Sequence, residues 1–367
     1  MFRKISRGCL LALLACPVVA LAEPIYTMSF LPTGFDGRAM NSAGYIVGNT
    51  GAGVGIWNGS SLIDLGLGAN SYAYAINSRG DVAGSLDGAY GQPFLYTSGV
   101  LRHAGPALDE GFQAGRVNGL NELGQMAGEY ATLGGGGHAW VDANGSVRML
   151  GTLSGMPTWS VAAAINKRGQ VVGGSTYEGA RDRWTGHAFL YQDGTMVDLG
   201  TLGGWDSFAK DINDAGQVVG WSTDETGDMV PFIYTGGGMR HLGAFDGELV
   251  LGEATAINNA GMVVGWAQYA EGEARDAFLY AGKGMSNLNR LVQGADGWTV
   301  VEAYNINDAQ QILGKACRGD ECLSVRLDLV SAVPEPGSYA LLMAGLVLLA
   351  GWRQSGKRES LRFSQPA

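Results

Sequence analysis

The chain has 367 residues, of which 46% are hydrophobic, so it can bury a large core, and this excludes wholesale disorder. Its 60 glycines are about twice the usual share of roughly 7%. With only 10 prolines and no Gly-x-y period, they indicate many tight turns and exclude a collagen-like chain. Without the two terminal segments described below, 17 basic and 33 acidic residues remain, a net charge of about −16 that argues against nucleic-acid binding.

The N-terminus has the three parts of a secretory signal. Three basic residues precede an apolar segment over residues 8–20, and the small residues Ala20 and Ala22 then form a cleavage site. A competing lipoprotein site at Cys16 would leave this cleavage site unused. We therefore predict a signal peptide over residues 1–22, removed after Ala22, and an exported mature chain.

Residues 23–330 contain seven copies of one pattern, typically Ile-Asn-x-x-Gly-x-Val-Val-Gly. The copies recur about every 44 residues, at Asn41, Asn77, Asn121, Asn166, Asn213, Asn258 and Asn307. Each repeat has four short runs rich in Val, Ile, Phe and Tyr, separated by turn residues, as expected for strands. Four-stranded repeats of this length are typical of β-propeller blades. A stacked β-solenoid is the alternative.

The repeated asparagine and glycine predict a tight turn between the first two strands of each repeat. Asparagine at the first position of a turn can accept hydrogen bonds from backbone N–H groups, and glycine three residues later tolerates a positive φ. Calcium binding by Asn and Asp in these turns is the functional alternative. The seventh copy has Gln310 in place of the glycine, so we expect its turn to be strained or differently shaped.

The two ends of the array predict how it closes. The seventh repeat lacks a fourth strand, whereas residues 26–31 resemble a fourth strand with no repeat in front of them. We expect Tyr26 to Leu31 to pair with Cys322 to Leu329. The fold predicted is all-β, a seven-bladed β-propeller of four-stranded antiparallel blades closed by the N-terminal strand, followed by a short C-terminal apolar helix.

The histidines and cysteines favour structural roles. The four histidines, at 103, 138, 187 and 241, fall at repeat positions that would lie far apart around a ring, so a shared metal or a His-based triad is not expected. Motifs for metalloproteases, serine hydrolases and phosphate-binding loops are also missing, and we expect no cofactor. Cys317 and Cys322 remain in the mature chain with four residues between them, which suits a disulfide across a hairpin in an oxidising compartment.

Aromatic residues in the loops that lead into the repeats are candidates for ligand binding. Three tryptophans hold this position: Trp159, Trp205 and Trp298. Asp206 directly follows Trp205. Tyr72 is an aromatic residue in a similar position. In a propeller these loops share one rim, where aromatic rings could stack on sugars. Nearby polar groups could bind the sugar hydroxyls: Asp36, Asp206, Glu253 and Arg183. The alternative is that each tryptophan packs between repeats, since tryptophan mostly buries its area.

Two functions follow from these features. The first is a non-catalytic scaffold that binds exopolysaccharide or another surface partner. The second is a glycan-active enzyme, which would need two carboxylates roughly 5–10 Å apart around a cleft in the central funnel. A channel lined by the small residues of the first strands would argue against catalysis: Ala73, Ala75, Ala162 and Ala164.

The C-terminus is a processing segment. A polar, proline-rich linker over residues 331–338 precedes an apolar run over 339–352, which is followed by basic residues beginning at Arg353. The run has 14 residues, fewer than the roughly 20 of a stable spanning helix. Basic residues behind it would keep residues 353–367 on the cytoplasmic side. The alternative is a plain, short membrane anchor.

This segment resembles the PEP-CTERM sorting signal of Gram-negative bacteria through Pro334, Glu335 and Pro336, the apolar run and Arg353. The resemblance implies processing by an exosortase, transient anchoring in the inner membrane and release to the surface of exopolysaccharide-producing cells. The polar tail after Trp352 is longer than is usual in that family.

Residues 23–330 resemble the extracellular HAF repeats, named for the triplet found here at His187, Ala188 and Phe189. Related triplets occur at the same position of the other repeats. The resemblance implies an exported repeat protein and carries no established activity.

Overall fold

The computed structural model describes residues 24–106, 112–132, 136–156, 158–177, 185–245, 249, 251–269 and 274–330. The predicted signal peptide and the predicted segments 331–338 and 339–367, with the sorting motif, lie outside the described residues. Ile25–Val330 form one compact body. No helix in the described ranges is long and apolar enough to cross a membrane.

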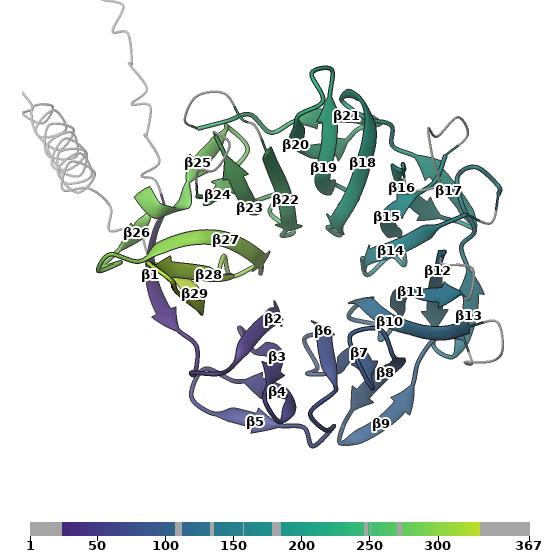
Figure 1. Cartoon of the computed structure of the whole chain (residues 1–367), viewed down its shortest axis with the longest axis horizontal. Helices are drawn as coiled ribbons and strands as arrows, with labels where there is room; N and C mark the ends of the chain where they lie inside the picture. The colour runs from purple at the N-terminus through teal and green to yellow at the C-terminus, as the bar shows by residue number, and fades with distance from the viewer. Residues whose placement is uncertain are drawn as a thin grey trace, which may run out of the picture. The chain divides into compact units, whose positions relative to one another are not determined.

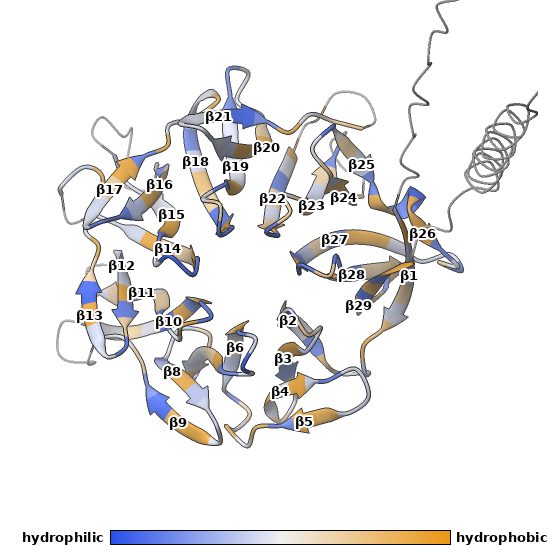
Figure 2. Ribbon diagram, turned by 180° about the vertical axis from the view of Figure 1, so that it is seen from behind, coloured by the Kyte–Doolittle hydropathy of each residue, from blue (hydrophilic) through white to orange (hydrophobic). Residues whose placement is uncertain are grey.

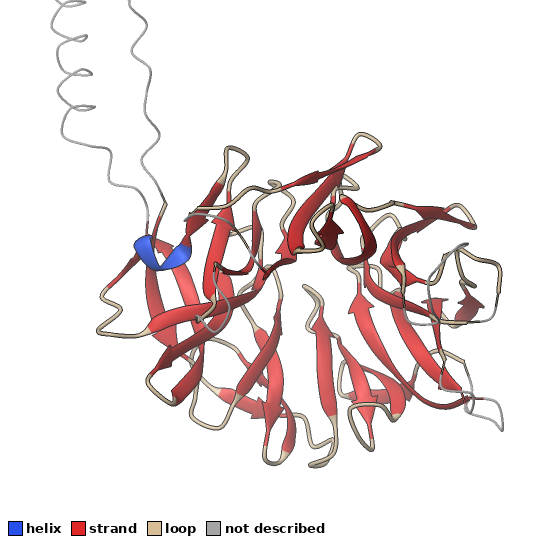
Figure 3. Ribbon diagram, turned by 45° about the horizontal axis from the view of Figure 1, so that its top comes forward, coloured by secondary structure: helices blue, strands red, loops and turns tan. Residues whose placement is uncertain are grey.

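The described chain is all-β apart from one short 3₁₀ helix, as predicted for its class (Figure 3). Each repeat forms a four-stranded antiparallel module, and we number the modules 1 to 7 in chain order. Modules 1 to 3 consist of β2 (Asp36–Met40), β3 (Ile46–Thr50), β4 (Gly53–Trp57) and β5 (Leu62–Asp64); β6 (Tyr72–Ile76), β7 (Val82–Leu86), β8 (Gln92–Thr97) and β9 (Val100–His103); and β10 (Phe112–Leu120), β11 (Met126–Thr132), β12 (Gly137–Ala143) and β13 (Ser146–Met149).

Modules 4 to 7 follow the same order. They consist of β14 (Ser160–Ile165), β15 (Val171–Ser175), β16 (His187–Gln192) and β17 (Thr195–Asp198); β18 (Gly203–Ile212), β19 (Val218–Asp224), β20 (Met229–Thr235) and β21 (Gly238–His241); β22 (Leu251–Ile257), β23 (Val263–Gln268), β24 (Asp276–Tyr280) and β25 (Met285–Asn287); and β27 (Thr299–Ile306), β28 (Ile312–Arg318), β29 (Glu321–Val330) and β1 (Ile25–Phe30). The helix η1 (Leu288–Arg290) and β26 (Val292–Gln293) connect modules 6 and 7.

The N-terminal strand completes module 7. β1 pairs antiparallel with β29 in a register that places Tyr26 opposite Leu329 and Phe30 opposite Val325. The Leu31 N–H extends this pairing by donating to the Ser324 carbonyl at 3.0 Å. Tyr26 is fully buried, and β26 covers the outer edge of β1 in parallel. The pairing predicted from the two incomplete ends of the array is therefore present.

The hydrophobic cores lie between successive modules. In one cluster, Ala127 and Ala139 of module 3 pack with Ile165 and Phe189 of module 4. The phenylalanine of the HAF-like triplet is fully buried wherever a repeat has one: Phe94, Phe189, Phe232 and Phe278. Hydrophobic segments recur along the strands of every module (Figure 2). The repeated triplet thus places one large side chain against the preceding module, where its burial stabilises the contact.

The repeated asparagine closes the turn of its own module and also binds the next module. The Oδ1 of Asn213 accepts hydrogen bonds from the N–H groups of Ala215 (3.1 Å) and Gln217 (3.0 Å), as the turn prediction requires. Its Nδ2 donates to the carbonyl oxygen of Asn258 in module 6 at 3.1 Å. The same bond runs from every module to the next and returns from Asn307 to Asn41. The modules lie in a ring (Figure 1), and the seven bonds lead around it back to Asn41.

The turn of module 7 keeps this geometry without its glycine. The Gln310 N–H donates to the Asn307 carbonyl at 2.9 Å, the bond that glycine makes in the other turns. Gln310 does so at φ +62°, a left-handed conformation that is unfavourable for a residue with a Cβ. Of the two expectations for this turn, the strain is present, whereas a different shape is not.

Candidate functional site

One mouth of the central channel is a cavity of about 480 Å³ bordered by the repeated turns. The residue after each asparagine forms its rim: Ser42, Ser78, Glu122, Lys167, Asp214, Asn259 and Asp308. The acidic side chains of this rim bind neighbouring modules. Asp214 pairs with the Lys167 ammonium at 2.9 Å, and Asp308 accepts from the Asn259 N–H at 2.8 Å. These carboxylates therefore connect modules.

The waist of the channel is a smaller cavity, of about 230 Å³, formed by a β-bulge that recurs in the first strand of every module. Bulges re-aim side chains, and the waist is lined by the bulge residues. These are Arg38, Tyr74, Asn118, Ala163, Lys210, Thr255 and Tyr304. The next residue in each strand also lines the waist and is small in five modules: Ala39, Ala75, Gly119, Ala164 and Ala256.

Of the alanines expected in the channel, Ala75 and Ala164 line it, whereas Ala73 and Ala162 are buried between modules. The waist also contains charged residues, among them Arg38, and the lining is therefore mixed.

Asp211 occupies one of the small-residue positions of the waist. Its Oδ2 accepts from the Ile257 N–H of module 6 at 2.9 Å, and its Oδ1 accepts from its neighbour Ile212 at 2.8 Å. Desolvation raises the pKa of Asp211 from 3.8 to about 7, because these two hydrogen bonds offset only part of the cost of burying the charge. The folded protein thus holds a proton here that the unfolded chain releases.

This shift predicts a pH-dependent stability. The stabilising contribution of protonated Asp211 is complete below the unfolded pKa and is lost as the pH rises through about 7. Between pH 5 and pH 8 we expect the wild type to lose roughly 2–3 kcal/mol more than Asp211→Asn. Urea unfolding at both pH values measures this difference, with exposed Asp64→Asn as the control. Equal pH slopes in the wild type and Asp211→Asn would contradict it.

The four ligand-binding residues predicted from sequence differ in exposure and in their contacts. Trp298 is 9% exposed and packs against Phe30, with ring centroids 4.8 Å apart. Trp159 lies against Gly186, where an added Cβ would approach its ring to 2.6 Å. Trp205 is the exposed member, at 42%. Trp298 is therefore buried, as the packing alternative expects, whereas Trp159 is partly buried.

The polar residues expected beside the tryptophans also bind within or between modules. The carboxylate of Asp206 accepts from the Gly186 N–H of module 4 at 2.9 Å, and Glu253 pairs with Lys210 at 2.8 Å. Tyr72 lies in β6, and Arg183 lies outside the described residues. Asp36, in contrast, lines a further cavity, at the junction of the first and last modules.

His187 takes part in a local contact of module 4. Its Nδ1 lies 2.9 Å from the Asp198 carboxylate, and its ring stacks on Tyr177 with centroids 3.6 Å apart. Desolvation opposes ionisation of Asp198, but the hydrogen bonds from His187 and Gly200 and the charge of His187 hold its pKa below the usual value. Within the described ranges, no three His, Cys, Asp or Glu side chains are close enough to share a metal ion.

The cavity that Asp36 lines has a volume of about 540 Å³ and lies at the seam between modules 7 and 1, and we call it the seam cavity. Its polar lining comes from both modules: Asp36, Arg38, Glu302, Tyr304, Lys315 and Ser324. Leu31, Phe35 and Leu323 form an apolar wall. Among the described residues, the adjoining core has five buried members, Leu31, Phe35, Met40, Ile46 and Leu313, fewer than any other hydrophobic cluster. The last junction of the ring thus has the smallest core and a cavity beside it.

Charged and hydroxyl groups converge in the seam cavity. Arg38 pairs with Asp36 at 2.5 Å, and Glu302 is held by Arg275 of module 6 at 2.6 Å. Burial raises the pKa of the Tyr304 phenol, and the nearby charges of Glu302 and Asp36 raise it further. Tyr304 also donates a hydrogen bond to Glu302 and stays protonated, so its oxygen can accept a hydrogen bond from a ligand.

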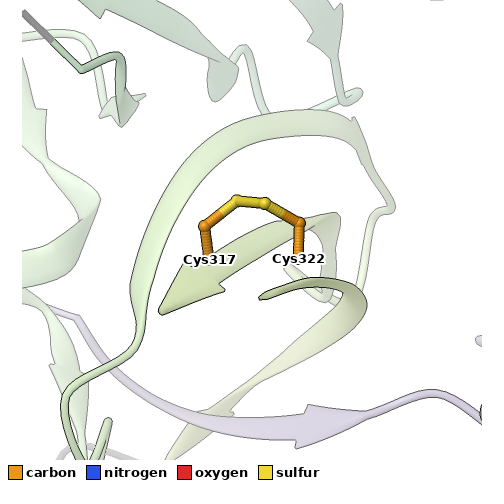
Figure 4. Close-up of a disulfide and its surroundings, with 2 residues drawn as sticks. All are labelled: Cys317 and Cys322. Atoms are coloured by element: carbon orange, nitrogen blue, oxygen red, sulfur yellow. A yellow bond between two sulfur atoms is a disulfide. The ribbon is translucent and has the colours of Figure 1, made fainter. Parts of the chain in front are cut away.

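Figure 4 shows the disulfide between Cys317 and Cys322. The two residues are directly opposite in the β28–β29 pair, and Cys322 lines the cavity. The disulfide therefore joins the two strands that carry Lys315 and Ser324.

Sequence reasoning identified Asp36 among the lining residues of the seam cavity and missed the others. Aligning the repeats with one another shows that some of these residues hold equivalent positions and that one is unusual for its position. Arg38 and Tyr304 hold the same position, three residues before the asparagine. Lys315 is the only cation at the position after the second glycine, where the other repeats have Asn, Ser, Glu, Gly or Trp.

Several solved structures are distantly similar to the chain. The extracellular domain of a protein described as a hybrid two component system from B. thetaiotaomicron has 12% identity and a TM-score of 0.49, over 84% of this chain and 40% of that one. An acylaminoacyl peptidase from Pyrococcus horikoshii has 12% identity and a TM-score of 0.49, over 82% and 52%. The β-propeller domain of the Trilobed protease from Pyrococcus furiosus has 12% identity and a TM-score of 0.44, over 70% and 84%.

The chain thus spans about two fifths of the length of the first of these proteins. At this level of similarity nothing about activity follows. No curated protein is similar enough in sequence to count as a relative.

Residues 332–358 match the PEP-CTERM protein-sorting motif. This match covers the Pro-Glu-Pro triplet at 334–336, the apolar run and Arg353, as the sequence predicted. The motif is the recognition signal of exosortase. The chain therefore carries the sorting signal of an exported, exosortase-processed protein.

Proposed function

We propose that residues 25–330 form a closed seven-bladed β-propeller of the HAF-repeat type, which serves as a non-catalytic scaffold binding exopolysaccharide at the cell surface or in the extracellular matrix. The circle of asparagine bonds, which returns to Asn41, supports seven blades around one axis. The sorting motif supports delivery to the surface. Before processing, the C-terminal apolar segment would hold the protein transiently in the inner membrane.

The seam cavity is the observation that carries the binding role. Sugar sites combine an apolar wall with a few well-placed hydrogen-bonding groups. Here Phe35 and Leu323 supply the wall, while Arg38, Tyr304 and Ser324 supply donors and acceptors. The opening between two modules also suits part of an extended chain.

A glycan-active enzyme is the second candidate, and one observation favours it. Asp36 and Glu302 both lie in the seam cavity, and both act electrostatically on Tyr304. Two carboxylates on either side of a cleft are what glycoside hydrolysis requires. Against this, each carboxylate is engaged by an arginine: Asp36 by Arg38 of its own strand, and Glu302 by Arg275 of module 6.

A glycan array separates these possibilities. We expect the full chain to bind immobilised bacterial oligosaccharides, and Arg38→Gln and Tyr304→Phe each to weaken binding by about tenfold, the loss of one hydrogen bond to a charged or buried group. Trp205→Ala, which alters the exposed rim, is the matched control and should bind normally. Binding lost in Trp205→Ala alone would instead support the rim site. Release of shortened products from soluble oligosaccharides would support the enzyme.

A further inference from the structure

Lys315 is a partly buried lysine on the wall of the seam cavity. No carboxylate of the described residues lies within ion-pair distance of its ammonium group. A buried charge is normally paired, because removing it from water is costly, and Lys315 is removed from water in part. An unpaired ammonium that lines a cavity is therefore a feature to explain.

The expected partner of Lys315 is occupied elsewhere. Glu302 lies directly opposite Lys315 in the β27–β28 pair, the position from which opposite charges usually attract each other. However, Arg275 reaches across from module 6 and binds the Glu302 carboxylate at 2.6 Å, and Tyr304 donates to the same carboxylate. The guanidinium of Arg275 is itself held over the Trp266 ring, 3.8 Å from the centroid. The ion pair of Glu302 is thus made with Arg275 and not with Lys315.

The second carboxylate of the cavity is also engaged. Asp36 pairs with Arg38 at 2.5 Å and lies within 3.5 Å of the Ser324 hydroxyl. The negative charges of Asp36 and Glu302 are therefore each neutralised by the guanidinium group of an arginine. Lys315 remains as the uncompensated charge of the seam cavity, on a chain whose overall formal charge is −10.

We propose that the sugar bound in the seam cavity is anionic, and that its carboxylate or sulfate pairs with Lys315. This inference rests on the proposed glycan binding and specifies its ligand class. An anionic substituent would provide the negatively charged partner that Lys315 lacks within the protein. A charge-assisted hydrogen bond in a half-enclosed site is also stronger than one in open water. The apolar wall and the Tyr304 oxygen then receive the uncharged part of the sugar.

The test compares three matched trisaccharides. One is built from neutral galactose, one from galacturonate and one from sulfated galactose. Their affinities for the full chain are measured by calorimetry in low salt. We expect the two anionic ligands to bind about tenfold more tightly than the neutral one. Lys315→Gln should remove this preference without changing the affinity for the neutral ligand, and Lys315→Arg should retain most of it.

The control is Lys283→Gln, which removes the same charge from an exposed loop of module 6. It should keep the preference, which excludes a general effect of net charge. A preference shared by uronate and sulfate shows that charge is recognised, and one confined to uronate identifies the carboxylate.

Equal affinity for neutral and anionic ligands in the wild type would overturn this inference while leaving glycan binding intact. A preference that survives in Lys315→Gln would also overturn it. Failure of all three trisaccharides to bind would instead count against the proposed function of the seam cavity. Thermal melting of each variant verifies that the fold is unchanged.

Discussion

Replacing Asn213 by alanine should destabilise the protein by about 2–4 kcal/mol, because buried backbone groups on two modules lose their partners. The side chain is 4% exposed. Its Oδ1 accepts from two N–H groups of its own turn, and its Nδ2 donates to Gln217 and to the carbonyl of Asn258. The midpoint of urea unfolding, combined with its slope, measures the change in free energy.

The matched control is Asn58→Ala. Asn58 also caps a turn, accepting from the N–H groups of Ser60 at 3.0 Å and Ser61 at 2.8 Å. Its side chain is only partly buried, and within the described ranges it makes no hydrogen bond to another module. We expect this change to cost about 0.5–1.5 kcal/mol, the usual value of one solvent-accessible set of hydrogen bonds. If Asn213→Ala cost no more than Asn58→Ala, the bond between modules would contribute nothing to stability.

The sequence was sufficient to predict the turn role of these asparagines but not their second role. The Asn-x-x-Gly spacing is local, and local hydrogen bonds can be derived from it. The bond from Asn213 to Asn258 joins residues 45 apart, and it depends on how closely the modules approach at the axis. The repeat period predicts which modules are adjacent, but it does not determine how closely their turns approach one another.

The candidate site shows the same limit. The tryptophans were selected because they occupy similar positions in the repeats, yet their exposure differs with their neighbours. Trp159 packs against Gly174 and Gly186 of its own module and is partly buried, whereas Trp205 stays exposed. Comparison of the repeats distinguishes Lys315, but only the seam cavity places Lys315 and Tyr304 in one site. The exposure and contacts of a residue at a repeat position depend on the modules on either side of it.

The seam differs from the other junctions in how its two modules are connected. Each of the other junctions is between modules continuous in the chain, whereas the seam joins the first repeat to the last. There the core has five buried residues, and β1 reaches across from the N-terminus to complete module 7. Tyr26 is the only buried side chain of β1, so the attachment of β1 to module 7 rests largely on it.

Tyr26→Ala should accordingly be among the most damaging single substitutions, costing about 3–5 kcal/mol, as for other large buried aromatic residues. Tyr26 is fully buried in a cluster with Leu279 of module 6 and Leu327 of module 7. Its N–H donates to the Leu291 carbonyl at 2.8 Å, a bond that alanine retains, so the loss reports on packing of the ring. Chemical unfolding of the full chain measures it.

Tyr26→Phe is the control that separates packing from polarity. Among the described residues, the buried Tyr26 hydroxyl has no hydrogen-bond partner, and desolvation raises its pKa to about 12. Removing an unsatisfied buried hydroxyl should leave stability unchanged or raise it by about 1 kcal/mol. A loss in Tyr26→Phe as large as that in Tyr26→Ala would mean that the hydroxyl, and not the ring, holds β1 in place. A loss below about 1 kcal/mol in Tyr26→Ala would mean that β1 stays on module 7 without the packing of the Tyr26 ring.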